Sequence, residues 1–270
     1  MSGARVAVVR FPGVNCESES ARALARGGLE PELFIWTRPA SELRDFQAYV
    51  LPGGFSYQDR VRAGALAAKD PLVEVLAEEA GRGKPVLGIC NGAQVLVEAG
   101  LVPGGSGVEL ALARNHMPDR SGYYARWIYT RVESSRCVFT RGLDEGALLP
   151  LPVAHGEGRF TSREPGRVDA LASAGQVPLR YAESNGSLAE RFPSNPNGAE
   201  AAAAAVCNGQ GHVLALMPHP ERAQDAGALP PAVAGRWGSA RAAARMAGER
   251  DAAGPGLALF EGLKRHLMED

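Results

Sequence analysis

The sequence has almost no net charge and no long apolar run. Its 29 Lys and Arg residues nearly balance its 30 Asp and Glu residues, which gives a formal net charge of −1 over 270 residues. Nucleic-acid-binding proteins usually carry a basic stripe, so this balance argues against one. No apolar run reaches the roughly 18 residues of a transmembrane helix, and the first residues lack the apolar core of a signal peptide. We therefore expect a cytoplasmic protein that binds neither nucleic acid nor membrane.

Cysteine is also scarce, and its spacing excludes further classes of protein. The four cysteines are far apart and form no C-x-x-C pair, which argues against a disulfide framework or a zinc ribbon. The phosphate-binding pattern G-x-x-x-x-G-K-[ST] is absent as well. We expect this chain to hold no metal and no nucleotide cofactor. Three of the cysteines lie outside any reactive motif and are predicted to be small buried or loop thiols: Cys16, Cys137 and Cys207.

What the sequence does contain is an alternation of short apolar runs and helix-like segments. Its length and its 45% content of hydrophobic residues suffice for one large α/β domain. Asn15 is the predicted N-cap of the first helix, and Asp70, followed by Pro71, that of the second. This alternation indicates a parallel sheet with helices on both faces. In the first half, strands are predicted at 6–9, 33–36 and 49–51, helices at 17–26 and 72–80, and a further strand in the apolar run that begins at Pro85.

The second half is richer in strands, and part of it is predicted to be antiparallel. Residues 229–254 are rich in Ala, Gly, Arg and Pro, so we interpret them as a surface insertion that is partly helical at most. Apolar residues at helical spacing over 257–267 predict a terminal helix. We expect one domain over residues 1–270 with a mixed, mostly parallel sheet. Its later strands are predicted at 125–132, at 151–158 where a strand runs into a polar loop, at 177–182, and in a hairpin that turns at 208–211.

The segment around Cys90 has the pattern of a nucleophile elbow. A short apolar run ends in Gly88-Ile-Cys-Asn-Gly92, and a helical pattern follows. In such an elbow a strained turn between strand and helix exposes the reactive side chain at the carboxyl end of the strand. The elbow needs glycine at positions 88 and 92, because a Cβ there would collide with the neighbouring strand and helix. The new helix directs its positive dipole end at the sulfur. Cys90 is therefore the predicted nucleophile.

A cysteine nucleophile needs a base, and the base needs a group that orients it. Met217-Pro-His-Pro-Glu-Arg222 follows the last predicted strand, and in an extended segment Glu221 can hold the imidazole of His219. His155 is the rival candidate for the base. Taken singly, the His-Pro-Glu segment can be a rigid turn and the elbow can be a packed buried cysteine. Their occurrence together, in this order, favours a catalytic triad.

The reaction of an acyl group at Cys90 also needs donors for the oxyanion. The backbone amide of Asn91 at the helix start is one candidate. The Pro52-Gly53-Gly54 turn follows a strand that ends at the same edge of the sheet, and Gly53 or Gly54 can bring a second amide close. The alternative is an ordinary strand-to-loop turn. Loss of one oxyanion donor typically costs about 10²–10³ in rate.

Together these residues resemble the class I, or triad-type, glutamine amidotransferases. The resemblance lies first in Gly-Ile-Cys-Asn-Gly-Ala-Gln at 88–94 and in Pro-His-Pro-Glu at 218–221. Further segments are similar to the glutaminase subunits of phosphoribosylformylglycinamidine synthases, which act in purine synthesis. These segments are RFPGVNC at 10–16, LPGGFSY at 51–57, HGEGRF at 155–160, NPNG at 195–198 and MPHPER at 217–222. The similarity covers about residues 4–224 and the terminal helix.

The resemblance implies a flavodoxin-like three-layer fold and a defined chemistry. Cys90 would attack the side-chain amide of glutamine and form a γ-glutamyl thioester, which water would then hydrolyse to glutamate. His219, oriented by Glu221, would take the proton of the Cys90 thiol and transfer it to the departing ammonia. Gln94 would help to hold the substrate; the alternative for it is a solvated helix residue.

Other residues follow from the resemblance alone. The loop that contains His155, Glu157 and Arg159 would border the glutamine site, unless it is only a polar connection. The remaining candidates would serve the pocket or a partner surface: Phe55, Ser56 and Arg126. The resemblance also implies two partners, a large synthetase subunit and a small bridging subunit. ATP and Mg²⁺ would belong to the synthetase, since this chain has no phosphate-binding loop.

The sequence departs from the family at a few positions. Gln58 stands where the family usually has glycine, and Arg60 where an aromatic residue is common. The segment 229–254 is not typical of the family. Three other hypotheses remain open: a cysteine hydrolase or peptidase on the same scaffold, a non-catalytic binding subunit, and an amidotransferase for another acceptor. Formation of a thioester from glutamine at Cys90 distinguishes the amidotransferase from the hydrolase, and the intact Cys90, His219 and Glu221 argue against the non-catalytic subunit.

Overall fold

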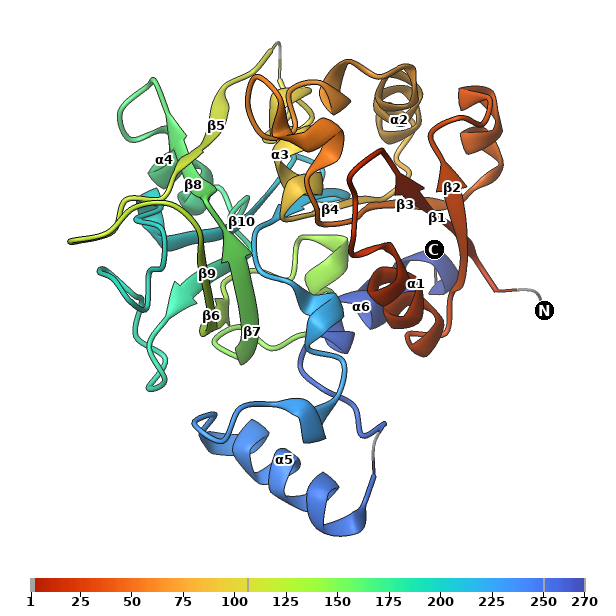
Figure 1. Cartoon of the computed structure of the whole chain (residues 1–270). Coiled ribbons are helices and arrows are strands. Elements are labelled where there is room, and N and C mark those ends of the chain that lie inside the picture. Colours follow the sequence, from red (N-terminus) through yellow and green to blue (C-terminus); the bar gives the residue numbers. More distant parts are fainter. Residues whose placement is uncertain (1–2, 106, 250, 270) are drawn as a thin grey trace.

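The computed structural model describes residues 3–105, 107–249 and 251–269. Its centre is a nine-stranded sheet in the order β2-β1-β3-β4-β11-β10-β9-β6-β7 (Figure 1). Neighbours from β2 to β11 pair in parallel, and neighbours from β11 to β7 pair antiparallel, so only β10 and β6 run against the rest of this sheet. This confirms the predicted mixed, mostly parallel sheet. The strands are β1 Arg5–Arg10, β2 Glu30–Ile35, β3 Ala48–Leu51, β4 Val86–Ile89, β6 Tyr124–Val132, β7 Leu148–His155, β9 Leu179–Ala182, β10 Ala203–Cys207 and β11 Val213–Leu216.

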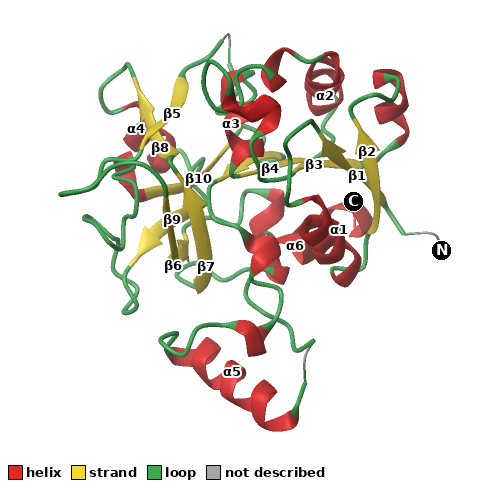
Figure 2. Ribbon diagram, in the orientation of Figure 1, coloured by secondary structure: helices red, strands yellow, loops and turns green. Residues whose placement is uncertain are grey.

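Helices cover both faces of the parallel half of the sheet. Helices α1 (Glu17–Arg26) and α6 (Leu257–Glu269) lie on one face, and α2 (Pro71–Gly81) and α3 (Asn91–Glu98) lie on the other (Figure 2). All residues of β3, β4 and β11 are buried, as expected for parallel strands that are covered on both sides. The three-layer α/β fold is therefore confirmed. Among the described residues, no helix is both long and apolar enough to cross a membrane.

The polar segment after β7 is more regular than its sequence suggests. Instead of a loop, Glu157–Ser162 forms strand β8, which pairs antiparallel with β5 (Leu110–Arg114) in a separate two-stranded sheet. A short helix, α4 (Arg167–Ser173), follows. Only Gly156 separates β7 from β8, so the chain turns sharply there. The consequence is that His155 and Glu157 are both fixed by strands.

The two predicted helix caps have different outcomes. The Asp70 carboxylate accepts a hydrogen bond from Leu72 N at 2.9 Å, which confirms it as the cap of α2. The prediction for Asn15 is wrong, because Cys16 occupies the cap position of α1 and makes no side-chain cap bond. Asn15 Oδ1 instead accepts from the Cys16 thiol at 3.2 Å. The backbone amides of Asn15 and Cys16 both donate to Gly53 O, which ties this loop to the end of β3.

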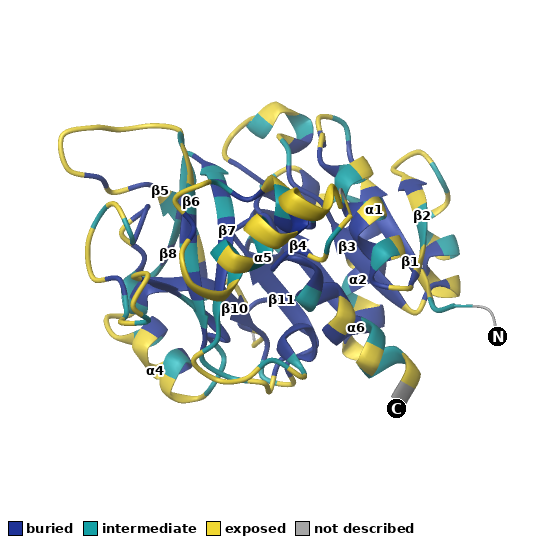
Figure 3. Ribbon diagram, turned by 90° about the horizontal axis from the view of Figure 1, so that it is seen from below, coloured by how far each residue is buried: buried dark blue, intermediate teal, exposed yellow. Residues whose placement is uncertain are grey.

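Residues 229–254 contain an exposed helix, α5 (Gly235–Ala247), set apart from the main body (Figures 1 and 3). The segment is nevertheless attached to the β6–β7 edge of the sheet. Trp237 Nε1 donates to Leu148 O of β7 at 2.9 Å, and Ala234 N donates to the hydroxyl of Tyr129 at 2.9 Å. Because β7 is an edge strand, the contact with Trp237 covers one of its outward carbonyl groups.

Candidate active site

Cys90 lies on a strained turn between β4 and α3. Its backbone has φ 51° and ψ −103°, a conformation that residues with a side chain rarely adopt and that costs of order 1–3 kcal/mol. A Cβ on Gly88 would lie 2.5 Å from the Gly92 carbonyl, and a Cβ on Gly92 would overlap the carbonyl of Leu51 in β3. The glycines therefore let α3 sit directly on the strands, and the predicted elbow is confirmed.

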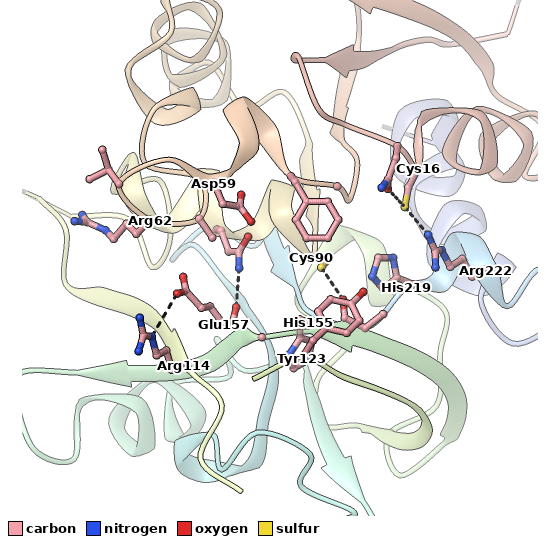
Figure 4. Close-up of a pocket in the computed structure, with 18 residues that line it drawn as sticks. Cys16, Asp59, Arg62, Cys90, Arg114, Tyr123, His155, Glu157, His219 and Arg222 are labelled. Atoms are coloured by element: carbon pink, nitrogen blue, oxygen red, sulfur yellow. Dashed lines mark hydrogen bonds and ion pairs between the residues drawn. The ribbon is translucent and has the colours of Figure 1, made fainter. Parts of the chain in front are cut away.

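The base and its orienting group follow β11. His219 Nδ1 lies 2.6 Å from Glu221 Oε1, and both side chains are buried. The His219 amide donates to Pro152 O in β7, which fixes the backbone on the other side. Because Glu221 occupies Nδ1, Nε2 of the imidazole is left for the sulfur of Cys90 (Figure 4). The spacing predicted from the His-Pro-Glu segment therefore produces a pair within hydrogen-bonding distance.

The surroundings of His219 favour its protonated form. Burial by itself lowers the pKa of His219, but the negative charge of Glu221 and the sulfur atoms of Cys90 and Cys16 outweigh this effect. The net result is a pKa well above the ordinary value for histidine. A protonated imidazole next to the nucleophile can donate a proton to a leaving amine.

The loop after β3 packs against both catalytic residues. Gly53 has no room for a side chain, because a Cβ would lie 2.8 Å from His219 Cε1 and 3.3 Å from Cys16 Sγ. Gly54 lines the same cavity as Cys90. The side chain of Asn91 accepts from Ser56 N at 2.9 Å and so links this loop to the start of α3. The loop that contains Gly53 and Gly54 is thus linked to the start of α3, and the assignment of their backbone amides to the oxyanion stays a prediction.

His155 is held in one tautomer by Asn115. Asn115 Oδ1 accepts from Gly158 N at 3.2 Å, while its Nδ2 donates to the His155 carbonyl at 2.8 Å. The same oxygen lies 3.0 Å from His155 Nδ1, so that nitrogen carries the proton. Burial, with a smaller effect of the charge on His219, lowers the pKa of His155 to about 3. A histidine that stays neutral and already donates from Nδ1 to the protein is poorly suited to be the base, which favours His219.

The other predicted substrate residues occupy different positions. Gln94 is buried at the cavity wall rather than solvated, and both ends of its amide bond protein groups: Nε2 donates to Glu157 O at 2.7 Å, and Oε1 accepts from Asn91 at 2.9 Å. Glu157 lines the cavity and lies 3.9 Å from Arg114. Arg159 does not line the cavity; its Nε donates to the Arg114 carbonyl at 3.2 Å.

The cavity in front of Cys90 has a volume of about 370 Å³ and carries charge of both signs. Asp59, Arg62, Arg114 and Glu157 lie on the side away from His219 (Figure 4). Burial and the nearby charge of Glu157 raise the pKa of Asp59 to about 6. A zwitterionic ligand such as a free amino acid fits a wall of this kind, because it can meet both a cation and an anion there.

The structure also shows the positions of a residue that departs from the family pattern and of the remaining candidates for the pocket or the partner surface. Gln58 has φ 59°, in the left-handed region that favours glycine, which accounts for the glycine expected there. Phe55 lines the cavity and is 46% exposed, and Ser56 is buried beside it. Arg126 does not reach this cavity and lines a separate one beside β6.

Sequence reasoning missed several residues that line the cavity. The most consequential is Cys16, whose Sγ accepts from the guanidinium of Arg222 at 3.0 Å and lies next to His219. Tyr123 covers the same region from the loop before β6. The available signal for Cys16 was its place directly after the loop that leaves β1, at the carboxyl edge of the sheet.

A nucleophile, a base and an orienting carboxylate in this arrangement carry out acyl transfer through a covalent intermediate. On a three-layer α/β sheet, they define a triad-type cysteine enzyme. Residues 3–263 match the family model of the CobB/CobQ-like glutamine amidotransferase domain.

Known relatives narrow the class. The phosphoribosylformylglycinamidine synthase subunit PurQ of Methanothrix thermoacetophila is 43% identical over 272 residues, covering 98% of each chain. The protein of that name from Thermus thermophilus is 42% identical over 221 residues, which cover 82% of this chain and 90% of its own. A chain in the structure of PurLQS from Thermotoga maritima has a TM-score of 0.72 at 30% identity, covering 98% of this chain and 99% of its own. The chain therefore belongs to the PurQ family of glutamine amidotransferases.

Proposed function

We propose that this chain is the glutaminase subunit of phosphoribosylformylglycinamidine synthase. It hydrolyses glutamine to glutamate and passes the ammonia to an ATP-dependent synthetase subunit, which converts formylglycinamide ribonucleotide to formylglycinamidine ribonucleotide. The observation that carries the proposal is the buried pair of His219 and Glu221, 2.6 Å apart, beside the elbow of Cys90. The family membership of nearly the whole chain supports the choice of reaction.

The catalytic steps follow from the roles of these residues. The Cys90 sulfur attacks the carboxamide carbon of glutamine while His219 takes the thiol proton, and backbone amides from Gly53 or Gly54 and Asn91 hold the oxyanion. Protonated His219 donates a proton to the departing nitrogen, and ammonia leaves as the C–N bond breaks. The neutral imidazole then removes a proton from water, which attacks the thioester carbonyl. His219 returns this proton to the departing sulfur, so that glutamate is released and the thiol is restored.

Binding of glutamine is assigned to the charged end of the cavity. Glu157 and the nearby arginines can meet the α-amino and α-carboxylate groups, while Gln94 and His155 shape the wall around the carboxamide. Since both ends of the Gln94 amide are bonded to the protein, we assign it to positioning Glu157 and Asn91 rather than to direct contact.

The synthesis step belongs to partner subunits. A large synthetase subunit would bind ATP and Mg²⁺, and a small bridging subunit would complete the complex. One solved relative is a chain in a PurLQS structure, which supports a complex of this kind. Ammonia is protonated in neutral water, so direct transfer between subunits preserves the reactive form. A biosynthetic role and four free cysteines also fit the cytoplasm.

The test is formation of formylglycinamidine ribonucleotide by a reconstituted complex that contains either this chain or its Cys90→Ala variant. Each complex is supplied with glutamine or, separately, with ammonium at high pH. We expect the variant to lose the glutamine reaction and to keep the ammonium reaction. Cys137→Ala, which removes a buried thiol that does not line the cavity of Cys90, is the matched control and should keep both. If Cys90→Ala keeps the glutamine reaction, the elbow is structural and the proposal is wrong.

A further inference from the structure

A second cysteine lies on the catalytic histidine, and the mechanism does not use it. The Sγ of Cys16, one nitrogen of His219 and one carboxylate oxygen of Glu221 all lie within 4.8 Å of one another. All three side chains are buried. Figure 4 shows His219 with the sulfur of Cys90 on one side and the sulfur of Cys16 on the other. Thiolate, imidazole and carboxylate are the three ligand types that zinc takes from proteins.

The spacing of these atoms is close to that of a zinc site. Zn–S bonds of about 2.3 Å and Zn–N or Zn–O bonds of about 2.0–2.2 Å place tetrahedral ligand atoms about 3.3–3.6 Å apart. Since the present limit is 4.8 Å, the ligand atoms must approach one another by about 1.5 Å at most. Three protein ligands leave the fourth position for water or another donor, as in zinc sites with an open coordination position.

One buried oxygen of the cluster, Glu221 Oε2, has no hydrogen-bond partner among the described residues. Glu221 is fully buried, so its second oxygen is an unmatched acceptor in the protein interior. A cation that binds there satisfies this oxygen. The acceptor and the nearby thiol are independent observations that indicate the same type of ligand.

One neighbour opposes a cation. The guanidinium of Arg222 donates to Cys16 Sγ at 3.0 Å and carries a positive charge. Arg222 is an exposed residue at the cavity mouth, so its long side chain can turn toward solvent when the sulfur binds a metal. The cost of this exchange limits the site to cations with a strong preference for sulfur, which excludes Mg²⁺.

We propose that Cys16, His219 and Glu221 form an inhibitory zinc site. Zn²⁺ displaces the proton of the Cys16 thiol and one ring proton of His219, both of which pass to solvent, and it binds the sulfur, the imidazole nitrogen and the carboxylate without any change of oxidation state. The metal removes the general acid and base from the reaction and leaves Cys90 unbound. Glutamine hydrolysis therefore stops while the fold stays intact.

The binding test uses the full chain and compares three alanine variants of cysteine. Zinc stoichiometry and affinity are measured by equilibrium dialysis, and Co²⁺ serves as a probe because a cobalt–thiolate bond absorbs in the near ultraviolet. We expect one bound metal in the wild type, in Cys90→Ala and in Cys137→Ala. Cys16→Ala should lose the cobalt–thiolate band. Its affinity should fall at least about tenfold, because losing even an outer-shell partner of a ligand typically costs 10–100-fold.

The pattern across these variants decides the proposal. Loss of binding in Cys90→Ala with binding kept in Cys16→Ala would show that zinc binds the catalytic cysteine, and the proposal would be wrong. Absence of tight binding in the wild type would also overturn it. Cys16→Ser serves as a second variant if the alanine variant fails to fold, which circular dichroism reports.

The inhibition test uses the reconstituted complex and depends on the proposed function. Zn²⁺ should inhibit glutamine hydrolysis by wild type and by Cys137→Ala, whereas Cys16→Ala should need at least about tenfold more zinc relative to its own zinc-free rate. Excess Mg²⁺ should not inhibit. Equal zinc sensitivity of Cys16→Ala and wild type would refute the inhibitory role. If no glutaminase activity is found, the proposed function fails, but metal binding by the free chain still tests the site.

Discussion

The buried neutral histidine gives a stability prediction whose size can be calculated. In the folded protein the pKa of His155 is lowered to about 3, against an ordinary value of 6.5 in the unfolded chain. Below pH 6.5 the unfolded state therefore binds a proton that the folded state does not. The stabilisation is fully present above that pH and is lost as the pH falls toward 3.

The size of this effect at mild pH depends little on the exact folded pKa. Between about pH 7.5 and about pH 5, an unfolded histidine of pKa 6.5 takes up most of a proton, while the folded His155 takes up almost none. The free energy of unfolding should fall by about 2 kcal/mol from this one group, at 1.36 kcal/mol per pKa unit. Any folded pKa below about 4.5 gives nearly the same result.

The assay is urea unfolding of wild type and His155→Asn at the two pH values. Asparagine can still donate to Asn115 Oδ1 but cannot take up a proton. The variant should therefore lose about 2 kcal/mol less than wild type on acidification, even if it is less stable at neutral pH. His116→Asn, at an exposed histidine, is the control and should behave as wild type. Equal pH dependence of wild type and His155→Asn would refute the neutral state assigned to His155 and its burial cost.

Other substitutions test the elbow, the triad and the inserted helix. Gly92→Ala places a Cβ against the carbonyl of β3 and should cost about 1–3 kcal/mol in urea unfolding, whereas Gly81→Ala, with nothing within 4 Å, should gain about 0.5–1 kcal/mol. Similar effects at both sites would contradict the steric argument. Glu221→Gln removes the charge that raises the pKa of His219, so the pH profile of kcat for glutamine hydrolysis should move to lower pH; an unmoved profile would disprove the pairing. Trp237→Phe loses one hydrogen bond to β7 and should lower the free energy of unfolding by about 1 kcal/mol without changing the glutaminase rate. A changed rate would mean that the inserted helix acts on the site.

The parts of the site that could be predicted are those in which the chemistry is local in the sequence. The elbow needs one glycine two residues before Cys90 and another two residues after it. The orienting carboxylate lies two residues after His219. Both patterns fit within a few residues, so they can be recognised without knowing the fold. The strands beside them are short buried runs, and their type was correct although their ends differed by a few residues.

The parts that were missed depend on contacts between distant segments. Cys16 reaches His219 only because β1 lies next to β3, and because Gly53 has no side chain between them. Asn115 fixes His155 across 40 residues of sequence, from the end of β5 to the end of β7. Asparagine is a favoured cap residue, but Asn15 lies one residue before the cap position of α1, because its backbone is tied to the end of β3. The periodic pattern of apolar residues in the sequence does not show which distant segments come into contact.

The sheet topology explains why residues as far apart in the sequence as Cys16 and His219 line one cavity. Strands β1, β3, β4, β11 and β7 run in the same direction, so the segments at their carboxyl ends meet at one edge of the sheet. The nucleophile follows β4, and its base follows the adjacent β11. The loop after β3 passes on the other side of the imidazole, and its missing side chain at Gly53 admits the segment that follows β1. That gap allows the ring of His219 to sit against two sulfur atoms at once. The same packing that orients the catalytic base therefore also creates the three-ligand cluster, so the proposed zinc site arises from the fold without any separate element.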